Sequence, residues 1–443
     1  MNHALPGDVH QAGSCRRSNE IIALTNPLNG PILEYMKTAI PIERKVFVMA
    51  TEFGLHSEVL YGAGTTDQLG AKAKELGATK AVLACDRNLG EKTYDRLKKS
   101  LTDAGVDFVF FNETERDAPI HLVNKPGDIA KEAGADCMIG VGGGSTMDMV
   151  KAATVLLCYP GTAEDYVLPV PPLVPVNVPI ILIPTTGGTG SEGTNAAIIS
   201  RDVDGLNMKW SLHTSLTQTI IDPELMVTLP PYETAYTGMD ALSHAMEGLT
   251  GTNPNPLAHA CGLNAIRKIS RYLLRAYHDG NDMEARVQMA EAAYLAGVAF
   301  DAPLTQIGHA TADGLATYQH LPHGVGCALS LPECMILSGP AKPEIMLEIA
   351  EAFEVECDPD MSGEQLGTLV AEKCKSMMSE MGIPSLAQMG IARERMLEVS
   401  KETETSHLSD FCPVPVTHEL AVEFCYRVYD NYAGSEHPWP DQD

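Results

Sequence analysis

The chain has 443 residues, of which 44% are hydrophobic and 20% are charged, and its formal net charge is −27. This length is enough for two or three domains with cores of their own. The acidic balance argues against nucleic acid as a partner, because little positive charge is left to neutralise phosphates. No run of about 18 apolar residues is present that would predict a membrane span.

Eleven cysteines are scattered along the chain without C-x-x-C spacing. Cys85, Cys137 and Cys158 fall inside apolar runs, as small hydrophobic side chains do. This usage predicts a reduced, cytoplasmic protein. The first residues lack a basic region followed by an apolar core, so they do not have the pattern of a signal peptide. Residues 1–47 show no regular pattern, and we interpret them as an N-terminal extension.

Short apolar runs alternate with segments of helical period between residue 58 and about residue 225. Amphipathic stretches such as 66–78 and 91–106 separate runs that are typical of buried strands. Those runs cover residues 80–86, 106–111, 136–145 and 178–186. Alternation of this kind builds a parallel sheet with helices on both faces. We therefore predict an α/β dinucleotide-binding domain over residues 48–226.

Strand signals almost vanish beyond about residue 226. Segments rich in Ala, Leu, Met and Glu predict helices there, punctuated by Gly and Pro. These helices are expected at 255–277, 283–300, 342–354, 363–381 and 417–431. The second domain, residues 227–443, is thus predicted to be all-α.

Two glycine-rich loops each follow a predicted buried strand. In the first, Gly142, Gly143 and Gly144 lead into a helix that begins near Ser145. Glycines let the backbone approach a phosphate closely, and a helix N-terminus offers unpaired N–H donors. The second loop, residues 184–196, is crowded with hydroxyls and glycines. The pattern is not the G-x-G-x-x-G fingerprint, and each loop alone is compatible with a tight turn, but the pair favours a nucleotide site at the carboxyl ends of the strands.

Asp86 closes the predicted strand 80–86 at the same edge of the sheet. A carboxylate in this place accepts hydrogen bonds from both ribose hydroxyls and repels a 2′-phosphate, which favours NAD over NADP. The alternative is that Asp86 caps the helix that follows it.

Asp240 and His244 stand four residues apart in a segment of helical period, so both side chains project from one helix face. His309 and His323 complete the set only if the fold brings them back to this face. One carboxylate and three imidazoles suit Fe(II), Zn(II) or another divalent first-row metal. The alternative for the first pair is a helix cap beside an ordinary buried histidine.

From about residue 50 to its C-terminus, the chain resembles the group III, iron-dependent alcohol dehydrogenases. Besides the region around His309, the motifs that carry the resemblance are GGGSTMDMVK (142–151), PTTGGTGSEGT (184–194), IDPELMVTLPP (221–231), GMDALSHAMEG (238–248) and LPHGVGCALSLP (321–332). The resemblance implies a dehydroquinate synthase-like fold with Asp240, His244, His309 and His323 as the metal ligands. It also implies that NAD is bound by Gly142, Gly143, Gly144, Ser145, Asp148, Thr185, Thr186, Thr189 and Lys209, although the spacing around Lys209 differs from that of the family.

Two positions depart from the family pattern. Members commonly carry a second histidine four residues after the third ligand, where it is thought to relay a proton, and this chain has Asp313 there. Asp313 could take over the relay, orient a ligand histidine, contribute to the metal or simply lie at the surface, and His320 is another candidate relay. An Asn-Pro pair of the family is replaced by Asp117-Ala118.

The resemblance implies reversible hydride transfer between a small alcohol, or its aldehyde or ketone, and NAD. Fe(II) is the expected metal and Zn(II) the alternative. A zinc polyol dehydrogenase of the glycerol dehydrogenase type and a hydroxyacid-oxoacid transhydrogenase are the alternative activities. A dehydroquinate synthase-like lyase is disfavoured, because it needs several basic residues to bind a phosphorylated substrate and few are found around the predicted cleft. A non-enzymatic scaffold is disfavoured because the predicted ligands and glycine loops are intact. Family members are usually dimers or larger, so a homodimer or larger homo-oligomer is expected.

Overall fold

The computed structural model of the chain describes residues 53–167 and 173–439. The predicted N-terminal extension, residues 1–47, lies outside the described residues. Residues 51–443 group into one compact unit, which contains every element discussed below.

Six parallel strands form the main sheet, in the order β1-β9-β6-β4-β2-β3. They are β1 (Glu58–Tyr61), β2 (Lys80–Cys85), β3 (Asp107–Phe111), β4 (Cys137–Gly142), β6 (Ile180–Pro184) and β9 (Gln218–Ile221). The four predicted apolar runs correspond to β2, β3, β4 and β6. The predicted parallel sheet is therefore confirmed.

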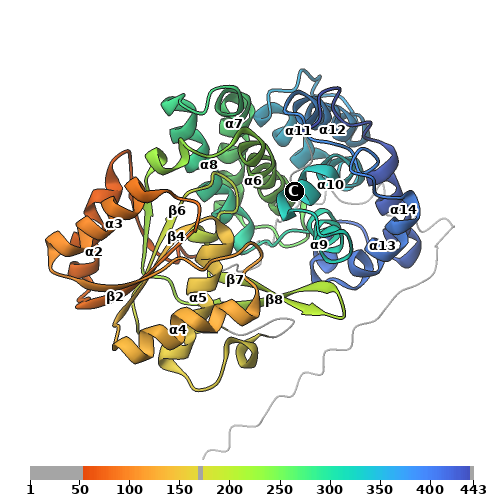
Figure 1. Cartoon of the computed structure of the whole chain (residues 1–443). Helices are drawn as coiled ribbons and strands as arrows, with labels where there is room; N and C mark the ends of the chain where they lie inside the picture. The colour runs from red at the N-terminus through yellow and green to blue at the C-terminus, as the bar shows by residue number, and fades with distance from the viewer. Residues whose placement is uncertain (1–52, 168–172, 440–443) are drawn as a thin grey trace, which may run out of the picture. The chain divides into compact units, whose positions relative to one another are not determined.

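Alternate residues of the central strands face two separate hydrophobic layers. Val82 and Met138 pack with α4 (Ile120–Ala133) and α5 (Gly144–Cys158). Leu83 and Ile139 pack with α2 (Leu69–Glu75) and α3 (Glu91–Ala104). Figure 1 shows these two pairs of helices on opposite sides of β2. Because both faces are covered, the central strands are apolar throughout, which explains their continuous apolar runs.

The order of the strands reverses between β2 and β4. The chain passes from β2 through α3 to β3 on one side, whereas it passes from β4 through α5 towards β6 on the other. In open parallel sheets, ligands bind in the crevice at such a switch point, outside the carboxyl ends of the strands. Asp86 follows β2 and Gly143 follows β4, so both flank this crevice.

A second, three-stranded sheet has the order β5-β8-β7. Its main part is the antiparallel hairpin of β7 (Ala196–Val203) and β8 (Leu206–Thr214), and β5 (Leu173–Val174) pairs with β8 in parallel. The hairpin turns at Asp204 and Gly205, both with positive φ (55° and 82°). This is the two-residue turn that an Asp-Gly pair favours.

Helices dominate the chain after β9, and in the described residues from 227 onwards no strand is present. They are α6 (Pro231–Thr250), α7 (Pro256–His278), α8 (Met283–Asp301), α9 (Ile307–Gln319), α10 (His323–Ser338), α11 (Pro343–Ala352), α12 (Gly363–Glu380), α13 (Met396–Thr405) and α14 (His418–Asp430). The predicted all-helical second part is confirmed. The exact boundary between residues 226 and 227 stays a prediction.

α6 lies at the centre of the helical part, where it packs against α7, α8 and α10 (Figure 1). Pro231 at its first position sets the helical φ in advance. Its residues from Met239 to Thr250 are all buried, as expected of a helix covered on every side. Polar side chains on α6 therefore need partners inside the protein. None of the described helices is both long and apolar enough to cross a membrane.

Candidate metal and nucleotide site

The side chains of Asp240, His244, His309 and His323 meet in the interior of the helical part. Asp240 and His244 lie one turn apart on α6, His309 lies in the first turn of α9, and His323 is the first residue of α10. Asp240 is only 2% exposed, and His244 and His309 are each 4% exposed. The fold thus brings back the two late histidines, as the sequence-based prediction required.

Three imidazole nitrogens surround one carboxylate oxygen at nearly equal distances. The Nε2 atoms of His244 and His309 each lie 3.8 Å from Asp240 Oδ1, and Nε2 of His323 lies 3.9 Å from it. These distances are too long for hydrogen bonds. Asp240 Oδ1 and His309 Nε2 are both buried without a hydrogen-bond partner among the described residues. Buried polar atoms are rarely left unpaired, and a cation between these atoms would satisfy them together, so the donor set fits a divalent metal.

Burial and neighbouring charges set the protonation states of these donors differently. Burial lowers the pKa of His244 to about 3, so the ring is neutral at physiological pH. Burial works against the charge of Asp240, but the three neighbouring histidines hold its pKa below the usual value. Burial alone would lower the pKa of His323, yet Asp313 and Asp240 raise it to about 9. A metal must therefore displace a proton from His323.

Glu247 fixes the orientation of His309, a role that the sequence analysis missed. Nδ1 of His309 lies 2.8 Å from Glu247 Oε1. Since a carboxylate only accepts, Nδ1 carries the hydrogen and Nε2 keeps its lone pair for the metal. Burial raises the pKa of Glu247, but His309, Ser243 and a backbone N–H of Gln306 outweigh it, and the net shift is downward. The sequence signal for this role was the position of Glu247 three residues after His244, about one helical turn along α6.

Asp313 and His320, the two predicted relay residues, lie in different surroundings. Oδ1 of Asp313 lies 3.4 Å from Nδ1 of His323, on the ring edge opposite Nε2. His320 is exposed at the C-terminal end of α9 in a left-handed conformation, with φ 54°. Asp313 is therefore placed to orient a ligand ring, whereas His320 contacts none of the four predicted ligands.

Cys327 adds a sulfur to the cluster. The ligand atoms of Asp240, His309, His323 and Cys327 all lie within 4.8 Å of one another. Sγ of Cys327 lies 3.4 Å from His323 Nε2. The residue stands one helical turn after His323 and is fully buried. The sequence analysis treated cysteines as small hydrophobic side chains and did not consider this one.

The first glycine loop leaves no room for side chains. A Cβ on Gly142 would meet Thr146 Oγ1 at 2.6 Å and Asp86 Cβ at 3.1 Å. A Cβ on Gly144 would meet Thr189 Cγ2 at 2.9 Å. The loop is thus enclosed by Asp86 on one side and by the second loop on the other. The backbone N–H groups at the start of α5 lie at the switch point of the sheet, where they suit a pyrophosphate.

The second loop lies against the first. The backbone N–H of Thr185 donates to the carbonyl of Gly142 at 3.0 Å. Thr186 approaches Gly143, since a Cβ on that glycine would lie 3.3 Å from Thr186 Cγ2. Thr186 Oγ1 is buried without a hydrogen-bond partner among the described residues. An orphaned hydroxyl beside the glycine loop fits a bound nucleotide, while Thr189 Oγ1 accepts from the N–H of Ser191 at 3.4 Å.

Three further predicted residues hold the loops in place. Asp86 accepts a hydrogen bond from the N–H of Asn88 at 2.9 Å in the turn before α3, but the N-cap of α3 is Gly90, so Asp86 does not cap that helix. Both oxygens of Asp148 are engaged inside the protein, by Ser191 Oγ at 2.6 Å and by the N–H of Ile198 at 3.0 Å. Ser145 Oγ accepts from the N–H of Asp117 at 3.0 Å. For Asp148, the geometry indicates a structural link between α5 and the second loop.

Lys209 reaches the same region from β8. Its Nζ lies 2.6 Å from Asp117 Oδ1, and both side chains are largely buried. Asp117 and Ala118, which replace the Asn-Pro pair of the family, both have positive φ (66° and 44°). Burial alone would raise the pKa of Asp117, but Lys209 lowers it. Lys209 and Asp117 thus form an ion pair at the position where the chain departs from the family pattern.

The glycine loops and the histidine cluster are neighbours. A Cβ on Gly188 would lie 2.4 Å from the backbone oxygen of Thr237, one turn before Asp240 on α6. Thr317 Oγ1 on α9 donates to the carbonyl of Asn207 on β8 at 3.1 Å. Gly188 of the second predicted cofactor loop thus lies within one helical turn of the first predicted ligand.

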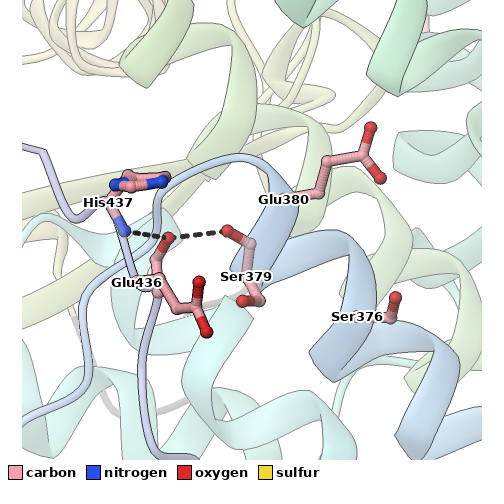
Figure 2. A pocket seen from close by; sticks show the side chains of 6 residues that line it. Ser376, Ser379, Glu380, Glu436 and His437 are labelled. Carbon is pink, nitrogen blue, oxygen red and sulfur yellow. Dashed lines mark hydrogen bonds between the residues drawn. The ribbon is translucent and has the colours of Figure 1, made fainter.

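A separate depression of about 450 Å³ lies near the end of α12 and contains none of the predicted residues. Figure 2 shows side chains that line it, of which Glu380, Glu436 and His437 are exposed. Ser435 Oγ donates to the carbonyl of Ser379 at 2.7 Å. Its polar groups do not converge on one point, so it is not the candidate site.

A parallel sheet with glycine loops at its switch point, next to a buried carboxylate and three histidines, fits the class of enzymes that use a nucleotide cofactor together with a metal, which includes oxidoreductases. Residues 56–223 match the model of the family "Iron-containing alcohol dehydrogenase", and residues 234–427 match that of the C-terminal part of Fe-containing alcohol dehydrogenases. The chain belongs to the iron-containing alcohol dehydrogenase family.

Individual relatives agree with this assignment. The chain is 33% identical to a choline dehydrogenase of Bacillus subtilis, over 79% of this chain and 88% of that one. It is 33% identical to an NAD-dependent methanol dehydrogenase of Bacillus methanolicus, over 78% and 91%. An alcohol dehydrogenase from Oenococcus oeni superposes with a TM-score of 0.80 at 29% identity, over 86% of this chain and all of that one. A 1,3-propanediol oxidoreductase gives a TM-score of 0.81 at 26% identity, with the same coverage.

The predicted family, fold class and enzyme class are therefore confirmed. The protein is an alcohol dehydrogenase of the iron-containing, NAD-dependent type. These findings support the main function predicted from the sequence rather than the polyol dehydrogenase or transhydrogenase alternatives. The roles of individual site residues stay predictions.

Proposed function

We propose that Asp240, His244, His309 and His323 hold the divalent metal of this dehydrogenase, and that the loops 142–145 and 184–189 hold NAD beside it. The observation that carries this proposal is the convergence of three Nε2 atoms on Asp240 Oδ1 at 3.8–3.9 Å. A divalent cation at this point polarises the substrate oxygen and lowers the pKa of the hydroxyl.

The residues of the chain prepare the hydride transfer in three ways. Asp86 binds the ribose, and the N–H groups at the start of α5 bind the pyrophosphate, which points the nicotinamide towards α6. Glu247 and Asp313 orient the rings of His309 and His323. Burial of the cluster excludes water, which strengthens the electrostatic interactions at the reacting atoms.

His309→Ala tests the metal site. We expect this variant to lose bound metal and more than about 100-fold of the alcohol-dependent NAD reduction, with an unchanged circular dichroism spectrum. His259→Ala is the matched control, because His259 contacts Glu348 on the outside of the helical part. Full activity of the His309 variant without metal would refute the proposal.

Asp313 is proposed as a positioning residue for His323, and His320 as the relay that moves the alcohol proton to solvent. Asp313→Asn should lower the affinity for the metal on the order of 10-fold in competition with a chelator. His320→Ala should leave metal affinity unchanged and alter the pH profile of kcat. If both variants change only the pH profile, Asp313 is a relay residue instead.

The substrate is proposed to be a primary alcohol or the corresponding aldehyde. Relatives named for choline, methanol, long-chain alcohols and 1,3-propanediol support this class, since these alcohols share a terminal hydroxyl. A panel of primary and secondary alcohols with NAD tests it. Faster turnover of secondary alcohols of equal length would refute it.

We further propose a cytoplasmic homodimer or larger homo-oligomer. Ten cysteines of the described residues are free, in keeping with a reducing compartment. Light scattering on the purified full chain should give at least twice the mass of 47.6 kDa. A mass of one chain at micromolar concentration would contradict the oligomer.

A further inference from the structure

The cluster on α6, α9 and α10 contains more donors than the four that the family pattern supplies. Cys327 belongs to the group of ligand atoms within 4.8 Å of one another, together with Asp240, His309 and His323. His244 lies at the edge of this group, with its ring stacked on Phe300 at 4.2 Å between centroids. The sulfur is thus one of four neighbouring ligand atoms that could hold a single cation.

The packing of α10 explains why Cys327 reaches this centre. A Cβ on Gly324 would lie 2.7 Å from the backbone oxygen of Tyr236 on α6, and one on Gly326 would lie 2.9 Å from Cα of Ala312 on α9. Both glycines let the start of α10 sink between the two helices that carry the other ligands. His323 and Cys327, at i and i+4, then share the inward face.

Burial alone does not distinguish Cys327, because cysteine is among the residues most often buried. Cys334, in the same helix, is also fully buried. It belongs to no such group of ligand atoms among the described residues. Sγ of Cys327 instead lies 3.4 Å from His323 Nε2, beside two buried atoms without partners, Asp240 Oδ1 and His309 Nε2.

We infer that the sulfur of Cys327 is a further donor to the metal held by Asp240, His309 and His323, and that it shifts the preference of the site towards Zn(II). The inference rests on the proposed function, since it uses the same metal centre. On binding, the Sγ–H bond breaks, the proton passes to solvent and a bond between Sγ and the cation forms, with no change of oxidation state. A thiolate is a softer ligand than carboxylate or imidazole and selects Zn(II) over harder cations.

Cobalt substitution tests the inference with a spectroscopic signal. Metal-stripped full-length protein is loaded with Co(II), and its near-ultraviolet absorption is recorded. The wild type and Cys334→Ala should show a sulfur-to-cobalt charge-transfer band, and Cys327→Ala should lack it. In competition with a chelator, Cys327→Ala should bind Zn(II) on the order of 10- to 100-fold more weakly than the wild type, with a smaller loss for Fe(II). If Cys327→Ala fails to fold, Cys327→Ser replaces it.

The outcomes separate the two proposals. A cobalt-loaded wild type that oxidises alcohols but lacks the band, or a Cys327→Ala variant that keeps the band, overturns the role of the sulfur and leaves the proposed function intact. A wild type that binds no Co(II), Zn(II) or Fe(II) overturns both.

Discussion

Glu247 is the residue on which the orientation of His309 depends. Its Oε1 accepts from Ser243 Oγ at 2.7 Å and from His309 Nδ1 at 2.8 Å. Its Oε2 accepts from the N–H groups of Gln306 and His309 at 2.9 and 3.2 Å. Every acceptor position of this carboxylate is therefore used, so an isosteric amide must turn its NH₂ group towards a donor.

Glu247→Gln should lower metal affinity on the order of 10- to 100-fold, because His309 loses its fixed tautomer and orientation. Metal content after dialysis against a graded series of chelator concentrations measures the effect. Glu333→Gln is the control, since Glu333 is equally buried but is paired with Arg427 at 2.9 Å. Equal metal retention in the two variants would show that Glu247 only supports the fold.

Glu192 gives the stability a specific pH dependence. It is 1% exposed, and burial raises the pKa of its carboxyl from 4.5 to about 7. Between these two pH values the folded state holds a proton that the unfolded state has lost, so the free energy of unfolding falls as the pH rises through this window. At 1.4 kcal/mol per pKa unit, the full effect is about 3 kcal/mol.

Glu192→Gln should remove this loss, so that the variant gains stability over the wild type at pH 8 but not at pH 4.5. Urea denaturation of the metal-loaded protein at both pH values measures the difference. Glu132→Gln, at an exposed position on α4, should behave like the wild type at both. A constant difference between the Glu192 variant and the wild type at all pH values would rule out this titration.

At the scale of elements, Lys151 ties α5 to the second glycine loop. The residue is fully buried. Its Nζ donates to Asp148 Oδ1 at 3.2 Å, to the carbonyl and hydroxyl of Ser191 at 2.7 Å each, and to the carbonyl of Ala196 at 2.5 Å. Burial lowers the pKa of this lysine, and Asp148 opposes the shift. The ammonium thus ties α5, which follows the first glycine loop, to the second glycine loop.

Lys151→Met should destabilise the protein by about 3 kcal/mol, because Asp148 is left buried without its cation. It should also raise KM for NAD, since the second loop loses its anchor to α5. Thermal unfolding and steady-state kinetics measure the two effects. Lys99→Met changes an exposed lysine on α3 and should alter neither. An unchanged KM in a destabilised variant would confine Lys151 to folding.

Element positions were predictable wherever burial imposes a period. α7 and α8 match their predicted ranges to within one residue at each end, because runs of helix-favouring residues begin there after the N-cap side chains of Asn255 and Asp282. The β7–β8 hairpin was not predicted, although the Asp204-Gly205 pair is a hairpin signal. The residues of β8 are mostly half-exposed, so it lacks the apolar run from which β2, β3, β4 and β6 were predicted.

The site was predictable as far as its residues lie in short motifs. Asp240 and His244 form one such motif, and the glycine loop 142–144 another. The tertiary contacts of Glu247 were not predictable, because it joins His309 across 62 residues of sequence. Cys327 differs from the other buried cysteines only by what lies opposite its sulfur, which depends on how closely α10 approaches α6 and α9.

At the scale of the whole molecule, the proposed metal site connects three helices that are far apart in the sequence. Asp240 and His244 come from α6, His309 from α9, and His323 from α10. The unfolded chain holds these donors apart, so a cation binds the folded state in preference and stabilises it by mass action. Metal binding and folding of the helical part are therefore linked.

Removal of the metal by a chelator should lower Tm by ~3 °C when the free metal was present at about 100 times Kd, because binding then contributes about 2.7 kcal/mol. Addition of Zn(II) or Fe(II) should restore the original Tm, and His309→Ala should respond to neither treatment. Scanning calorimetry of the wild type, His309→Ala and His259→Ala in parallel measures these shifts. A wild type whose Tm is indifferent to chelator and to both cations would mean that the buried carboxylate and histidines pair without a metal, contrary to the proposed site.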